Sequence, residues 1–223
     1  MGLVQKSERE EGRMKALLSK EKWKYLFYTV SHPSDGFYWI RHQERGSVAI
    51  AVLLVILYAV AFSMNRIYAS FVVNDIEPRT VNSIAELAGV LILYLVLCVG
   101  NWSITCLMEG EGRFKDILIA IGYSMVPMIV ATVLATLVSQ VVAENEEAFY
   151  TILMGLGTAY SVIMMLIGIM QIHNYTLGKT LVTLFLTIVA VLIIIFLALL
   201  VINFITQVYS FLRSIYTELV FRT

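Results

Sequence analysis

Five long apolar runs constrain this chain more than any other feature. They cover residues 48–71, 84–108, 117–142, 149–172 and 180–208, and each is near or above the roughly 20 residues that a helix needs to cross a bilayer. Only 14% of the chain is charged and 59% is hydrophobic, which excludes an ordinary soluble domain. Backbone amides in hydrocarbon must be paired within the protein. The predicted fold is therefore an all-α integral membrane protein, a compact bundle of five transmembrane helices.

The distribution of basic residues predicts how these helices are oriented. Residues 1–45 hold nine of the sixteen Lys and Arg residues, and segments rich in such residues stay on the cytoplasmic side of a membrane. We therefore expect a cytoplasmic basic amphipathic arm over 1–45, a membrane domain over 46–212 and a short extracytoplasmic tail over 213–223. The expected localisation is the plasma membrane, with the N-terminus inside and the C-terminus outside.

The arm itself has two parts. Residues 12–30 have the composition of an amphipathic helix, which either lies on an anionic leaflet or folds against the cytoplasmic end of the bundle. Both interpretations remain open. Residues 31–47 are predicted to be rich in turns, because Pro33 disfavours helix at His32 and the pair Asp35-Gly36 is typical of a turn.

Small residues at four-residue spacing predict close helix packing in the third and fourth spans. Ala131, Ala135 and Ser139 follow this spacing in one span, and Gly157 and Ser161 in the next. Such residues let two helix backbones approach closely in a membrane. The pattern favours a compact bundle over a wide aqueous pore, and it permits association with a second copy.

Two further features of the spans carry structural predictions. Pro127 cannot donate to the carbonyl of Tyr123, so the third span is expected to kink there, with Ser124 partly satisfying the freed carbonyl. Arg66 and Glu86 lie near the outer ends of the first and second spans. We expect them to form an ion pair.

The triplet Gly178-Lys179-Thr180 matches the end of a phosphate-binding loop. Such a loop needs a first glycine five residues before Gly178, between a strand and a helix. That position is His173, and a predicted membrane span precedes it. The stretch is therefore interpreted as a turn at the cytoplasmic face, in which Gly178 adopts conformations that other residues avoid.

Residue sets for catalysis are missing from the sequence. It contains neither the H-E-x-x-H zinc motif nor the G-x-S-x-G nucleophile motif, and no predicted span holds an aspartate that could belong to an intramembrane pair. Cys98 and Cys106 lie about 12 Å apart along one helix, beyond disulfide reach, and are expected to be buried, inert thiols. We expect no enzyme, no metal or other cofactor, and no nucleotide or nucleic-acid partner.

Three stretches together resemble the Yip1-domain family. They are IGYSMVP at 121–127, which is similar to the family's Gly-Tyr-Ser…Pro signature, EGEGRFKDILIA at 109–120 and NYTLGKTL at 174–181. The resemblance covers roughly 46–210 and implies the five-span fold. It also implies, for eukaryotic members, residence in Golgi and endoplasmic reticulum membranes, self-association and binding of prenylated Rab GTPases and coat machinery. The short arm and the missing DLYGP-type motif resemble bacterial members instead, so the Rab role does not transfer.

The working hypothesis is a non-enzymatic membrane scaffold or adaptor that binds protein partners or lipids. Its expected partners are the bilayer, anionic lipids through the arm, unidentified membrane proteins and a second copy. The alternative is a small-solute transporter or channel subunit, or an accessory subunit of a larger transporter, which the lack of ionisable residues at mid-membrane disfavours. The candidate interaction and structural residues are Gly110, Gly112, Arg113, Lys115, Gly122, Tyr123, Ser124, Pro127, His173, Gly178 and Lys179, and the candidate ion pair is Arg66 with Glu86.

Overall fold

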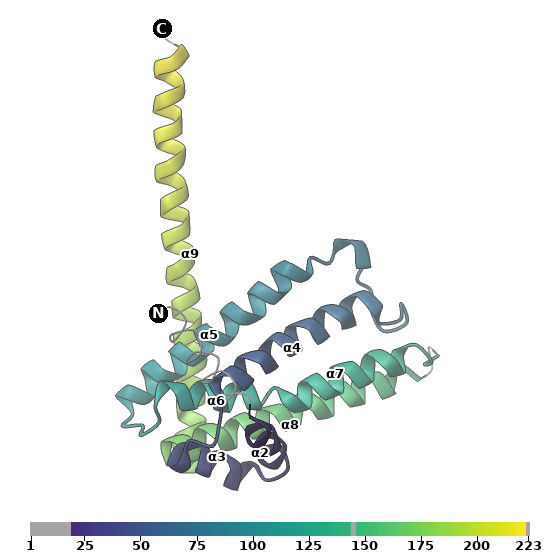
Figure 1. Ribbon diagram of the computed structural model, residues 1–223. Coiled ribbons are helices and arrows are strands. Elements are labelled where there is room, and N and C mark those ends of the chain that lie inside the picture. Colours follow the sequence, from purple (N-terminus) through teal and green to yellow (C-terminus); the bar gives the residue numbers. More distant parts are fainter. Residues whose placement is uncertain (1–18, 144–145, 222–223) are drawn as a thin grey trace, which may run out of the picture.

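The computed structural model describes residues 19–143 and 146–221, which form helices joined by short connections and contain no strand (Figure 1). The helices are α2 (Lys20–Ser31), α3 (Pro33–Gln43), α4 (Val48–Tyr68), the 3-10 turn η1 (Pro78–Thr80), α5 (Ser83–Leu107), α6 (Phe114–Tyr123), α7 (Val126–Ser139), α8 (Glu147–His173) and α9 (Leu177–Phe221).

All five predicted spans are helices long and apolar enough to cross a membrane. They are α4, α5, the α6–α7 pair, α8 and α9. The third span is broken, because α6 ends at Tyr123 and α7 starts at Val126 with Pro127 in its first turn. This confirms the predicted kink. Proline suits a first turn, where its missing N–H would have no intrahelical partner.

The helices meet at one end of the molecule and diverge from it (Figure 1). α4 packs against α5, α6 and α7, while α8 packs against α7 and α3. We call the end where α4, α6 and α9 begin and α5 and α8 end the arm end, because α2 and α3 pack there. The opposite end, where α4 and α7 end and α5 and α8 begin, is the far end.

Small residues make the α7–α8 contact, as their spacing predicts. Ala131, Ala135 and Ser139 are all buried on α7. Gly157 of α8 lies so close to α7 that a Cβ added there would come 2.1 Å from the Cβ of Ala131. The predicted packing is therefore confirmed at Gly157.

The described part of the arm folds against the bundle. Leu26 and Thr29 of α2 are buried, and the Tyr160 hydroxyl of α8 donates to the Val30 carbonyl at 2.6 Å. Phe27 on the opposite side of α2 remains 64% exposed. Of the two interpretations, residues 20–31 follow the packed one. The rest of the predicted arm helix, 12–18, lies outside the described residues.

The turn prediction for 31–47 is wrong over most of its length, because residues 33–43 form α3. His32 itself is not helical, as expected, but Pro33 occupies the first turn of a new helix, where proline is favourable. Gly36 is buried against α2, and an added Cβ would lie 2.6 Å from the Thr29 Cα. Glycine here serves a close helix crossing and not a turn.

The last helix is longer than a bilayer requires. α9 has 45 residues, or about 68 Å, against roughly 30 Å for the hydrocarbon core. Only Thr180, Thr183, Thr187 and Val191 are buried, and they face α5, where the Asn101 amide donates to the Thr187 hydroxyl at 3.1 Å. The helix continues through the predicted tail as far as Phe221.

The two cysteines of α5 are both free thiols, as expected from their separation. Cys98 is buried, as predicted. Cys106 is exposed, so the prediction that it would be buried is wrong.

Candidate functional site

His173 joins the two connections at the arm end that the sequence singled out. Its Nδ1 accepts a hydrogen bond from the Gly112 amide at 3.1 Å, which places the ring proton on Nε2. The imidazole also stacks on Tyr175, with 5.3 Å between ring centres, and the Tyr175 hydroxyl donates to the Met108 carbonyl at 3.1 Å. We call Gly110, Gly112, His173 and Tyr175 the latch.

The latch requires glycine at two positions because the imidazole fills the space beside them. A Cβ at Gly110 would lie 2.5 Å from His173 Nδ1, and a Cβ at Gly112 would lie 2.5 Å from Ile172. Neither glycine has a positive φ; the left-handed residue here is Glu109, at 56°. Close packing therefore holds the connection between α5 and α6 in place.

Charged residues next to the latch, beginning with Arg113 directly after Gly112, form a second cluster, which we call the carboxylate network. The Glu44 carboxylate accepts from Arg113 and from Lys115, each at 2.7 Å. Arg113 also pairs with Asp116 at 2.9 Å, and the Arg113 amide donates back to the same Asp116 carboxylate at 3.3 Å. These contacts join the α3–α4 linker to the start of α6.

Asp116 corrects one prediction from the sequence. The third span was expected to begin at 117 and to hold no aspartate, but α6 begins at Phe114 and includes Asp116 in its first turn. The carboxylate is almost completely buried, with 1% of its surface exposed. A carboxylate near a helix N-terminus is stabilised by the free amides and the helix dipole, and here Arg113 adds an opposite charge.

The two cations beside Glu44 give the fold an acid-sensitive contact. Hydrogen bonds from Lys115 and Arg113 hold the pKa of Glu44 below its ordinary value of 4.5. The unfolded chain therefore binds a proton at Glu44 before the folded chain does, so this stabilisation is complete above pH 4.5 and is lost as the pH falls through the lowered pKa.

We expect Glu44→Gln to remove this contribution to the pH dependence of stability. The free energy of unfolding, measured in detergent micelles from pH 7 to pH 3, should fall less steeply below pH 4.5 in the variant than in the wild type. Glu77→Gln, on the connection before α5, is the matched control because Glu77 forms no salt bridge with the described residues. Identical slopes for wild type and Glu44→Gln would contradict this assignment.

The last two candidates at this end have unequal roles. The Lys179 ammonium lies over the Tyr175 ring, 4.4 Å from its centre, and so adds to the latch. Gly178 lies in the first turn of α9 with open space around it. The predicted special conformation of Gly178 is wrong, because the left-handed residue of this connection is Asn174, with φ of 54°.

The first three residues of the Gly-Tyr-Ser-Met-Val-Pro stretch, Gly122 to Ser124, are buried inside the bundle and have a structural role. A Cβ at Gly122 would lie 2.9 Å from the Ala51 Cα. The buried Tyr123 hydroxyl accepts a hydrogen bond from the Ser47 amide, just before α4, at 3.1 Å. The Ser124 hydroxyl donates to the Ala120 carbonyl at 2.7 Å, so the expectation that it would serve the Tyr123 carbonyl is wrong.

A model of the Yip1 domain matches residues 27–200 of this sequence. The chain belongs to the Yip1-domain family. The match begins within α2 and includes α3, so it extends further toward the N-terminus than the resemblance at 46–210. No curated protein and no solved structure matches the chain.

The ion pair predicted for this Yip1-domain protein is present at the far end. Arg66 of α4 and Glu86 of α5 approach to 3.1 Å, which confirms the pairing. The Ser63 hydroxyl also donates to the Glu86 carboxylate, and the side-chain amide of Asn74 donates to the Arg66 carbonyl at 2.9 Å. The pair joins α4 to α5 and is separate from the latch.

Three residues at the arm end of this Yip1-domain protein were not predicted from the sequence: Glu44, Asp116 and Tyr175. Asp116 follows Arg113 by three residues, the spacing of a reciprocal helix cap, so a local signal existed. Glu44 is 69 residues from Arg113, and Tyr175 contacts a connection about as far away in sequence. These two contacts exist only because the chain folds back to this end.

Proposed function

We propose that this Yip1-domain protein is a non-enzymatic membrane scaffold whose docking surface is the arm end of the bundle. The observation that carries this proposal is the joining of separate connections there. The latch fixes the α5–α6 and α8–α9 connections to each other, and the carboxylate network fixes the α3–α4 linker to α6. A surface held in this way presents charges in a constant arrangement, which lowers the cost of ordering on binding.

The charges on this surface are accessible as well as fixed. The Glu44 side chain is 59% exposed, and those of Arg113 and Lys115 are 42% exposed. Glu111 on the neighbouring connection is 61% exposed. Exposed charges arranged in this way favour a partner of complementary charge, either a membrane protein or a second copy of the chain.

The proposed location is the plasma membrane, with the arm end in the cytoplasm. The support is the concentration of basic residues in 1–45 together with the packing of α2 and α3, which belong to this segment, at the arm end. Basic segments beside membrane spans remain on the cytoplasmic side. A cysteine accessibility assay in intact cells tests this orientation independently of any partner.

Site-specific photo-crosslinking in native membranes tests the scaffold proposal. A photoreactive residue at Glu111, on the proposed surface, should give a discrete protein adduct, whereas the same residue at Arg79, exposed on η1, should give none. Lys115→Glu in the same chain should lower the yield at position 111 severalfold, because it reverses a neighbouring charge. Absence of an adduct at 111, or equal adducts at both positions, would overturn the proposal.

A flux assay in liposomes separates this proposal from transport. Solute movement by the unsubstituted protein alone would contradict a purely structural role. Substitutions at Pro127 or Tyr123 do not discriminate, because the first lies at the break between α6 and α7 and the second contacts the start of α4. Loss of flux in such variants would report loss of structure.

A further inference from the structure

Arg45 occupies a fixed position in the linker between α3 and α4. Glu44 before it has a left-handed backbone, with φ of 52°, and its carboxylate belongs to the carboxylate network. Gly46 after it presses against α6, where an added Cβ would lie 2.8 Å from a methyl carbon of Ile119. The linker therefore holds the Arg45 Cα in one place relative to α6.

The Arg45 guanidinium is held by aromatic rings and forms no salt bridge with the described residues. It lies 5.7 Å from the centre of the Tyr25 ring and 5.8 Å from that of Trp39. Burial raises the pKa of Tyr25 to about 12, although Arg45 acts in the opposite direction, so Tyr25 is uncharged at cellular pH. By contrast, Arg113 and Lys115 are paired with carboxylates.

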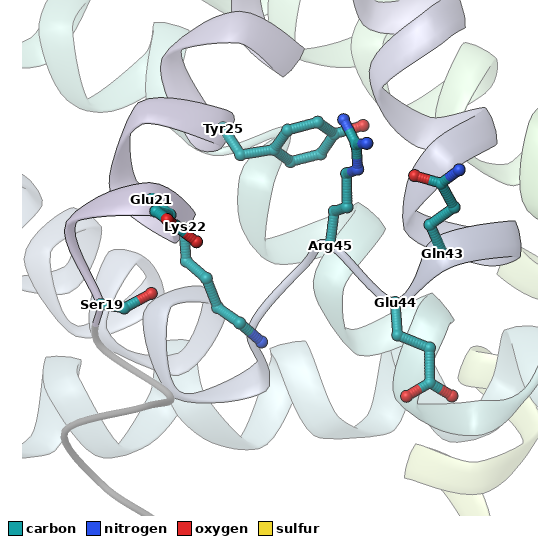
Figure 2. A pocket seen from close by; sticks show the side chains of 7 residues that line it. All are labelled: Ser19, Glu21, Lys22, Tyr25, Gln43, Glu44 and Arg45. Atoms are coloured by element: carbon teal, nitrogen blue, oxygen red, sulfur yellow. The ribbon is translucent and has the colours of Figure 1, made fainter.

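A cavity of about 410 Å³ lies between α2 and the linker and is lined by Arg45 and Lys22, whose side chains are drawn in Figure 2. The Lys22 ammonium donates to the Gly46 carbonyl at 2.9 Å, which leaves two of its three N–H donors. A second cavity of about 310 Å³ shares Tyr25 and Arg45 and adds Lys24. We call these two cavities together the Arg45 cleft.

The charges around the Arg45 cleft leave an excess of cations. Lys22, Lys24 and Arg45 line it, together with the carboxylates of Glu21 and Glu44. The Glu44 carboxylate is already paired with Arg113 and Lys115, and in Figure 2 it points the opposite way from the Arg45 guanidinium. Glu21 is then the one acid without a salt bridge among these lining residues, against three cations.

The length of α4 indicates that the Arg45 cleft lies at the level of the lipid headgroups. α4 begins at Val48, three residues after Arg45, and has 21 residues, about 31 Å in length. This length matches the roughly 30 Å hydrocarbon core, so Arg45 lies in the headgroup layer. Phe27, 64% exposed on α2 and three residues after Lys24, supplies an apolar surface beside the cations.

We propose that the Arg45 cleft binds the phosphate of an anionic phospholipid, with Arg45 as the main ligand and Lys24, which lines the same cavity of about 310 Å³, as a flanking donor. A guanidinium offers two parallel N–H donors to one phosphate, and the rings of Tyr25 and Trp39 hold it in position. The acyl chains lie against Phe27 and the start of α4. This inference rests on the proposed scaffold function only in taking the arm end as the binding end.

Native mass spectrometry of the full-length protein in detergent tests the inference. Phosphatidylglycerol should be retained more strongly than phosphatidylcholine, whose headgroup carries its own cation. Arg45→Ala should weaken phosphatidylglycerol binding about tenfold, the scale of a hydrogen bond to a charged group. The matched control Arg79→Ala, with the same charge change at the far end, should leave binding unchanged.

A second variant keeps the test independent of folding. Lys24 is exposed on α2, so Lys24→Ala should preserve the helical circular dichroism and weaken binding roughly threefold, as an exposed charge pair would. Equal retention of both lipids, equal weakening by Arg45→Ala and Arg79→Ala, or displacement of phosphatidylglycerol by millimolar inorganic phosphate would overturn the proposal. The adduct at position 111 should persist in Arg45→Ala, which separates failure of this site from failure of the scaffold function.

Discussion

We expect Gly157→Ala to lower the free energy of unfolding by about 2–3 kcal/mol, the upper part of the range for overpacking a close contact. The added Cβ would lie 2.1 Å from the Cβ of Ala131, well inside van der Waals contact. Relief requires α8 to move away from α7, which loses packing along the whole helix pair. Reversible unfolding in mixed micelles, followed by circular dichroism, measures the effect.

Two further variants show that the effect comes from this contact. Gly155→Ala, two residues earlier on α8, adds the same group into open space and should be neutral or stabilising by up to about 1 kcal/mol through helix propensity. The double variant Gly157→Ala with Ala131→Gly moves one methyl across the contact and should recover most of the loss. Failure to recover would show that the strain lies elsewhere.

We expect Gly122→Ala to cost about 3 kcal/mol or more, at or above the upper end for overpacking. The added Cβ would meet the Ala51 Cβ at 2.7 Å, its Cα at 2.9 Å and its carbonyl oxygen at 3.0 Å. Two of these atoms belong to the backbone of α4 and can yield only if the helix moves. The same micelle unfolding measurement applies.

The rescue should differ between the two sites, and this difference is a sharp test of the geometry. Ala51→Gly removes the Cβ but leaves the Cα and carbonyl in place, so it should recover only a minor part of the Gly122→Ala loss. Gly89→Ala on α5, with nothing within 4 Å, controls for the change in helix propensity. Full recovery by Ala51→Gly would contradict the backbone contact described for α4 and α6.

Local patterns predicted the parts of the fold that depend on one helix at a time. Apolar length identified all five spans, because a bilayer imposes that length on any spanning helix. Pro127 indicated the break in the third span, since a missing N–H acts within one turn. The spacing of Ala131 and Ala135 indicated which side of α7 packs closely, although it did not identify Gly157 as the nearest partner.

Predictions from local patterns failed where one residue type is compatible with more than one structural role. Asp35-Gly36 is typical of a turn, yet Gly36 lies in α3 because Thr29 of α2 crosses it closely. Gly178 was assigned the special conformation that Asn174 adopts. At Gly36 two explanations fitted the residue type, and only the packing distinguishes them; Gly178 has open space around it and no positive φ.

The candidate site shows the same difference between what local patterns predict and what tertiary contacts decide. Sequence reasoning selected Gly110, Gly112, Arg113, Lys115 and His173, and the structure brings all five to the arm end. They were candidates for interaction or structure; the glycines and His173 pack against one another, while the side chains of the two cations are 42% exposed. Tyr123 and Pro127, which were candidates for interaction or structure, have structural roles.

The sequence by itself determined the membrane class, the number of spans, the break at Pro127 and the family resemblance, because each depends on local composition or a short motif. Only the tertiary structure decided which residues meet. His173 reaches Gly112 across 61 residues and Glu44 reaches Arg113 across 69, while the Arg45 guanidinium lies against the rings of Tyr25 and Trp39. Such contacts depend on where helices cross, and the side-chain pattern of a single helix does not determine where it crosses another.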